Sequence, residues 1–221
     1  MDRNYCFIFS AKRSGSTLLK ALIGTRPDCS HLPETPFRNY ESIVSDKRIV
    51  VLKDPAGYNK INYPEFEPIE AKKIVLIRNP YDTICSMKEM HKSVNETREI
   101  RNSDQFLISH WYLVYNNIIE KRILENDDAM LVRYEDLLDQ PVSETEKIFK
   151  FIGTDFPQGT DTYLAPANYT WDWGNDDGAP IIKTLKVQKR HKEYIVNQPL
   201  LEFINSSPEI KSIMTYYGYS N

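Results

Sequence analysis

Four short apolar runs, each bounded by polar residues, are spaced along the first two thirds of the chain. They span residues 5–9, 48–52, 73–77 and 130–133 and are rich in β-branched side chains. Continuous apolar runs, without alternating polar positions, are typical of strands that are buried on both faces of a parallel sheet. The pattern therefore predicts four parallel strands.

Helical patterns lie between several of these runs. Residues 17–24 end at a glycine, residues 104–125 carry apolar side chains three and four positions apart, and residues 141–152 begin with proline and stop before Gly153. Strands that alternate with helices indicate an α/β protein with a doubly wound sheet. Residues 92–103 and 154–180 follow neither pattern, and ordered connections of such length often act as lids or binding loops.

Composition narrows the class of protein. A length of 221 residues favours a single domain over residues 1–221, and 41% hydrophobic with 27% charged residues is ordinary for a globular chain. The net charge of -3 gives no reason to expect a polyanionic partner. We therefore expect no nucleic-acid partner.

Cysteine content and the amino terminus point to a location. The three cysteines lack the close spacing of zinc sites and redox motifs, which fits a reducing compartment. The first apolar run, "YCFIF", is too short for a signal-peptide core or a membrane span. We expect a soluble cytoplasmic protein that does not bind membranes.

The turn after the first predicted strand, "SAKRSGSTLL", carries the first candidate chemistry. Its free backbone N–H groups would lie at the amino-terminal, positive end of the following helix. Such a group of donors is an anion-binding site. The triphosphatase pattern G-x-x-x-x-G-K-S/T needs lysine where this chain has Ser16, and Asp54, the one acidic residue near a strand end that could serve magnesium, sits behind Lys53. The turn suits a single 5′-phosphate better than a triphosphate; the alternative is a plain polar turn.

The other three strands also end in polar clusters, namely "KDP", "RNPYDTICSM" and "RYEDL". Ligands of open α/β sheets bind beyond the carboxyl ends of the strands, so these clusters should converge on one crevice. Asn79 and Pro80 would end the third strand and begin a helix, which aims Arg78 and Ser86 at a second phosphate. The alternative for Arg78 is a solvated cap.

The sequences "RSGSTLL", "RNPYDTICSM" and "RYEDL" together resemble the sulfotransferases that use 3′-phosphoadenosine 5′-phosphosulfate (PAPS), especially the tyrosylprotein and Golgi branch and its small bacterial relatives. The resemblance implies a three-layer α/β fold, with a mostly parallel sheet flanked by helices as in P-loop nucleoside triphosphatases. It implies that Arg78 and Ser86 bind the 3′-phosphate of PAPS, without a metal. The residues implied for the 5′-phosphosulfate are Arg13, Ser14, Gly15, Ser16 and Thr17.

The resemblance also implies a catalytic set. Arg13 and Lys53 take the basic positions that neutralise the transferring sulfuryl group, and Glu34 in "HLPETPF" takes the position of the base. His31 lies close enough in sequence to compete with Glu34 for that role.

Two further nucleotide contacts follow from the resemblance. Tyr134 in "RYEDL" resembles a nucleotide-contacting tyrosine, and "KTLKVQK" near the carboxyl terminus places Lys189 at the nucleotide. Lys183 stands where the family often has serine, so its role is open.

The acceptor is expected to be a small molecule with a hydroxyl or amine. The segment "APANYTWDWGNDDGAP", residues 165–180, mixes aromatic and acidic side chains, which suits a cationic natural product, although a solvated acidic loop is the alternative. Two other functions remain open, a P-loop kinase that requires magnesium and a nucleotide-binding module without catalysis. Acceptor identity and oligomeric state stay open.

Overall fold

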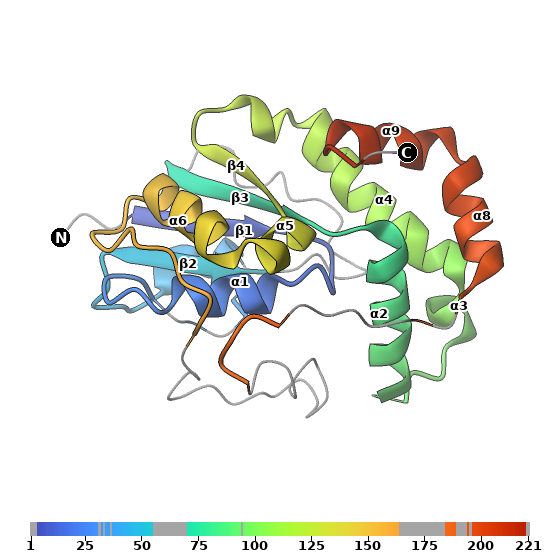
Figure 1. Cartoon of the computed structure of the whole chain (residues 1–221), viewed down its shortest axis with the longest axis horizontal. Coiled ribbons are helices and arrows are strands. Elements are labelled where there is room, and N and C mark those ends of the chain that lie inside the picture. The colour runs from blue at the N-terminus through green and yellow to red at the C-terminus, as the bar shows by residue number, and fades with distance from the viewer. Residues whose placement is uncertain are drawn as a thin grey trace.

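A computed structural model describes residues 4–30, 32, 34–35, 37–54, 70–93, 95–163, 184–188, 194 and 196–219 (Figure 1). The sheet has parallel strands in the order β2-β1-β3-β4. The strands are β1 (Asn4–Phe9), β2 (Ile49–Lys53), β3 (Ala71–Ile77) and β4 (Ala129–Arg133). The prediction of four parallel strands is confirmed, with bounds that differ by one or two residues.

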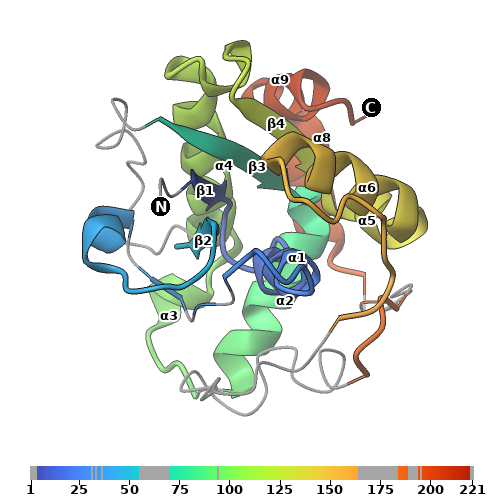
Figure 2. The same cartoon turned by 90° about the vertical axis from the view of Figure 1, so that its left-hand side faces the viewer.

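Helices cover both faces of the sheet (Figure 2). One face carries α1 (Ser16–Ile23), α5 (Tyr134–Asp139) and α6 (Pro141–Ile152). The other carries α2 (Pro80–Ser93), α4 (Asp104–Glu120), α8 (Gln198–Ser206) and α9 (Pro208–Tyr216). Successive strand residues supply the two cores, since Cys6 and Ile8 face α1 and α6 while Phe7 and Phe9 face α2 and α4. This is the predicted three-layer α/β fold.

The predicted helices are confirmed except at one end. Residues 141–152 form α6, and the helix expected at 17–24 is α1. The prediction that a helix continues from 104 to 125 was wrong, because α4 ends at Glu120, Arg122 takes a left-handed φ of 54°, and a 3-10 turn, η3 (Ile123–Glu125), follows. No helix within the described ranges is long and apolar enough to cross a membrane.

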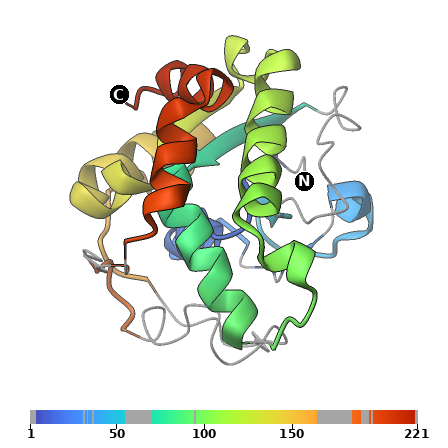
Figure 3. The same cartoon turned by 90° about the vertical axis from the view of Figure 1, so that its right-hand side faces the viewer.

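Several short or late elements were not predicted. These are η1 (Phe37–Ser42), α3 (Glu99–Asn102), α5, α8 and α9. The last two lie along the outer face, with α8 against α2 and α9 against α4 (Figure 3). Each has a capping residue and proline at its start, Asn197 before α8 and Ser207 before α9.

The strand order determines where a ligand crevice lies. The chain passes from β1 to β2 on one side and then returns to β3 on the other side of β1. Loops that leave the carboxyl ends of β1 and β3 therefore run to opposite faces, and this is the place at which open α/β sheets have their ligand crevice. The turn that begins at Ser10 and the turn that contains Arg78 flank this crevice.

Candidate functional site

The turn between β1 and α1 has the backbone of an anion site. Arg13 has a φ of 66° and Gly15 a φ of 92°, both left-handed. Left-handed residues beside right-handed ones turn successive N–H groups to one side. Gly15 is the N-cap of α1 and has no side chain with which to cap the helix. The first N–H groups of α1, which have no partner within the helix, therefore point to the same side as the N–H groups of the turn.

Gly15 also permits a close approach of Tyr134. A Cβ built on Gly15 would lie 2.2 Å from Cδ2 of Tyr134, so no larger residue fits there without movement. The same ring lies under the guanidinium of Arg78, at 4.7 Å from its centroid. Tyr134 therefore joins the turn after β1 to the turn after β3.

The two turns also touch directly. The Nη1 of Arg78 donates a hydrogen bond to the carbonyl of Arg13 at 3.1 Å, and the Nε of Arg13 donates to the Oγ of Ser86 at 3.2 Å. Arg78 is buried, and Trp111 of α4 holds its backbone by donating to its carbonyl at 3.1 Å. Arg13, Arg78 and Ser86, which the sequence placed on separate elements, lie in one polar cluster.

A second cluster forms where β2 ends beside α1. The Nζ of Lys53, only 1% exposed, lies 2.6 Å from both the Oγ1 of Thr17 and the Oε1 of Glu34. Burial lowers the pKa of Lys53, while the charge of Glu34 opposes that shift. The side chain of Glu34 is 38% exposed, so its carboxylate extends from a buried cation to the protein surface.

The structure places two further residues at the site that the sequence analysis missed. Tyr115 of α4 is fully buried, and its hydroxyl donates to the Leu76 carbonyl at 2.9 Å, accepts from the Ala11 N–H at 3.3 Å and lies 2.9 Å from the Oγ of Ser14. It fastens the turn to β3. Its position on an apolar helix face gave no signal of this contact.

Lys20 of α1 is the other missed residue. Its side chain is 1% exposed, and its Nζ donates to the carbonyl of Leu32. Burial and, to a smaller extent, the charge of Lys53 lower the pKa of Lys20 to about 7, while the charge of Glu34 opposes the shift. A lysine within "TLLKALI" is a signal that sequence reasoning had available.

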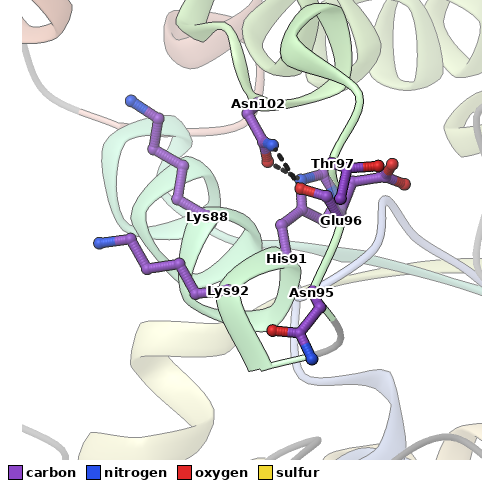
Figure 4. A pocket seen from close by; sticks show the side chains of 7 residues that line it. All are labelled: Lys88, His91, Lys92, Asn95, Glu96, Thr97 and Asn102. Atoms are coloured by element: carbon purple, nitrogen blue, oxygen red, sulfur yellow. Dashed lines mark hydrogen bonds between the residues drawn. The ribbon is translucent and has the colours of Figure 1, made fainter.

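A pocket of about 610 Å³ opens beside the carboxyl end of α2 (Figure 4). Its lining is polar and includes His91, whose Nδ1 lies 2.9 Å from the Oδ1 of Asn102. Burial is the main cause that lowers the pKa of His91, and the charge of Lys12, next to Arg13, adds to the shift.

Part of the predicted site lies outside the described residues. This applies to Lys189 and Lys183, to His31, and to residues 164–180, which include the mixed aromatic and acidic stretch.

Comparison with known proteins gives the family. A sequence profile of the Sulfotransferase family matches residues 40–158, more than half of the chain, a stretch that contains Lys53, Arg78 and Tyr134 but not the turn after β1. No curated protein sequence matches significantly.

Solved structures show the same fold. The sulfotransferase domain from the curacin biosynthetic pathway is 18% identical with a TM-score of 0.67, and the alignment covers 99% of this chain and 98% of that one. The corresponding values for the sulfotransferase domain of the Synechococcus PCC 7002 olefin synthase are 20%, 0.62, 100% and 96%. Those for mouse sulfotransferase SULT7A1, which was complexed with PAP, are 15%, 0.56, 99% and 86%. The chain therefore belongs to the Sulfotransferase family, and its fold is that of the P-loop-like sulfotransferases.

Proposed function

We propose that this sulfotransferase transfers a sulfuryl group from PAPS to a hydroxyl or amine of a small molecule. The observation that carries the donor assignment is the 3.1 Å hydrogen bond from Arg78 to the carbonyl of Arg13. It makes two anion-binding turns adjacent, which suits a nucleotide with separate 5′ and 3′ groups. The presence of PAP, the desulfated product of PAPS, in the mouse structure supports the same donor.

The residues beside the crevice fit such a nucleotide. The N–H groups of the turn after β1, each worth about 1.5–3 kcal/mol when bonded to a charged oxygen, would hold the 5′-phosphosulfate without a metal. Arg78 and Ser86 would hold the 3′-phosphate, with Tyr134 between the two turns. The remaining groups assigned to the nucleotide are Arg13, Ser14, Gly15, Ser16, Thr17 and Lys189.

Lys53 and Arg13 would supply the charge that transfer requires. Negative charge grows on the oxygen that leaves sulfur, and fixed cations in a site shielded from water stabilise that charge strongly. Lys53 is buried and already oriented by Thr17, so little reorganisation is needed as the charge develops.

Glu34 would act as the base. The acceptor oxygen or nitrogen forms a bond to sulfur, the bond between sulfur and the bridging phosphate oxygen breaks, and the acceptor proton passes to the carboxylate of Glu34. Its partial exposure lets it reach an acceptor while it stays beside Lys53. A positioned base contributes about 100- to 10,000-fold to the rate.

The acceptor, the location and the domain limits belong to the same proposal. A cationic natural product would suit the aromatic and acidic residues of segment 165–180, and we place the protein in the cytoplasm as one domain over residues 1–221. The proposed partner is a small-molecule acceptor and neither nucleic acid nor a membrane.

Transfer from radiolabelled PAPS to matched cationic and neutral alcohols, phenols and amines, with and without EDTA, tests the proposal. We expect labelled product with undiminished turnover in EDTA. Turnover of ATP that requires magnesium, without transfer from PAPS, would favour a kinase. Tight binding of PAP without any transfer would favour a non-catalytic module.

A further inference from the structure

Lys20 is a charged side chain in an apolar core. It belongs to α1, where Leu18, Leu19 and Ala21 are buried around it, and is itself only 1% exposed. Burying an ammonium group is unfavourable unless polar partners meet it, and leucine or methionine would fill a similar volume without that penalty. A buried lysine at this position is therefore expected to have a role that an apolar residue would lack.

The contact of Lys20 leads to Glu34. Its Nζ donates to the carbonyl of Leu32, two residues before Glu34. The same segment is joined to β2 at either side of this point. The N–H of Ser30 donates to the Ile49 carbonyl at 2.8 Å, and the N–H of Thr35 donates to the Lys53 carbonyl at 3.2 Å. Lys20 thus attaches the segment to α1, while the backbone attaches it to β2.

Lys53 alone is a poor anchor for Glu34 during the reaction. It is shared between Thr17 and Glu34, at 2.6 Å from each. In the proposed function Lys53 must also neutralise the leaving oxygen. As negative charge grows on that oxygen, it competes with Glu34 for the ammonium of Lys53, so the hold of Lys53 on Glu34 weakens at the moment when Glu34 accepts the proton.

We propose that Lys20 is a positioning residue, which holds the segment that carries Glu34 through the Leu32 carbonyl and keeps the base in place when Lys53 engages the donor. The inference rests on the proposed function, since it assigns the base role to Glu34. The lowered pKa of Lys20 is consistent with this role, because a lysine can donate a hydrogen bond in either charge state.

Turnover tests the inference through a double-mutant cycle. Lys20→Met is made in the wild-type and in the Glu34→Gln background, with Lys20→Gln as a milder variant that keeps a donor. We expect Lys20→Met to lower kcat about 10- to 100-fold in the wild-type background, because small displacements of a catalytic group have effects of that size. In the Glu34→Gln background it should lower kcat less than about twofold, since the two residues act through one another. The dissociation constant for PAP should change less than about twofold in all variants.

Lys73→Met is the matched control. Lys73 of β3 is also mostly buried and pairs with Asp128 at 2.5 Å, but it lies at the amino end of β3, away from the crevice. It should leave kcat within about twofold of wild type.

Amide hydrogen exchange gives a readout that needs no turnover. The amide of Thr35 should exchange about 10-fold faster or more in Lys20→Met than in wild type or Lys73→Met, because local opening becomes easier. Unchanged exchange would overturn the attachment, and equal loss of kcat in both backgrounds, or a parallel loss of PAP affinity, would overturn the positioning role. Wild-type protein without sulfuryl transfer would instead overturn the proposed function, and the positioning role with it, while the exchange result would still decide whether Lys20 holds the segment.

Discussion

Gly15 shows how one residue can serve two requirements. Its φ of 92° lies where only glycine is unstrained, and the ring of Tyr134 occupies the space of a side chain. Gly153, which ends α6, has a similar φ of 74° but has nothing within 4 Å of a built Cβ. The two glycines separate the cost of the backbone conformation from the cost of the contact with Tyr134.

Substitution of each glycine by alanine should therefore differ in effect. Gly153→Ala should lower the free energy of unfolding by about 1–2 kcal/mol, the cost of a left-handed backbone for a residue with a Cβ. Gly15→Ala should lower the free energy of unfolding by about 1–3 kcal/mol more than Gly153→Ala does, because its Cβ overpacks against Tyr134. It should also weaken PAP binding about 10-fold or more. Denaturant unfolding and PAP titration measure both. Equal losses in the free energy of unfolding for the two variants would show that the ring of Tyr134 can move aside without cost.

Glu34→Gln separates chemistry from binding. The amide keeps the shape of the side chain but does not accept the acceptor proton, so turnover should fall about 100- to 10,000-fold while PAP affinity stays within about twofold. Initial rates with saturating PAPS, beside PAP titration, measure the two quantities. Unchanged turnover would remove Glu34 from the role of base and leave His31 as the candidate.

At the scale of elements, Glu135 connects three parts of the chain. Its carboxylate accepts from the Asn79 N–H at 2.8 Å, just before α2, and from the Tyr219 hydroxyl at 2.8 Å, just after α9. Asn79 follows Arg78, so this carboxylate helps to set the direction in which the chain leaves β3. The glutamate of "RYEDL" therefore supports the turn that carries Arg78.

Removal of this support should affect one phosphate selectively. Glu135→Ala should weaken PAP binding about 10-fold, since hydrogen bonds to charged groups contribute about 1.5–3 kcal/mol. Binding of AMP, which lacks the 3′-phosphate, should change little. Asp136→Ala is the control, because Asp136 is half exposed and pairs only loosely with Arg133, at 3.7 Å. A similar loss for AMP would contradict the assignment of this turn to the 3′-phosphate.

For the whole molecule, the crevice joins elements from both faces of the sheet. The turn before α1 belongs to one layer and the turn before α2 to the other, and Tyr115 from α4 reaches Ser14 between them. A nucleotide held at both turns would therefore connect the two layers. Binding should stabilise the cooperative fold as a unit.

Thermal unfolding with PAP measures this effect. PAP at 100 times its dissociation constant should add about 2.7 kcal/mol of apparent stability, which corresponds to a rise of about 5–11 °C in Tm for a chain of this size. EDTA should not diminish the rise. A Tm that responds to ATP with magnesium but not to PAP would contradict the proposed donor.

The sequence by itself determined the secondary structure around the site. The four strands, α1 and α6 were predictable because apolar runs, glycines and prolines act over a few residues. The end of α4 at Glu120 was not, because the left-handed Arg122 has no local signal in the sequence. Helices α8 and α9 carry local capping signals at Asn197 and Ser207, so their starts could also be predicted from the sequence.

Only the tertiary structure decided how the candidate groups meet. The strand order β2-β1-β3-β4 sets β1 beside β3, which brings Arg78 to Arg13 and Tyr134 to Gly15. It also sets β2 beside β1, which brings Lys53 to Thr17. The bond from Lys20 to Leu32 belongs to the same group. These contacts join residues distant in sequence, and their geometry depends on how layers pack, which no local pattern of side chains encodes.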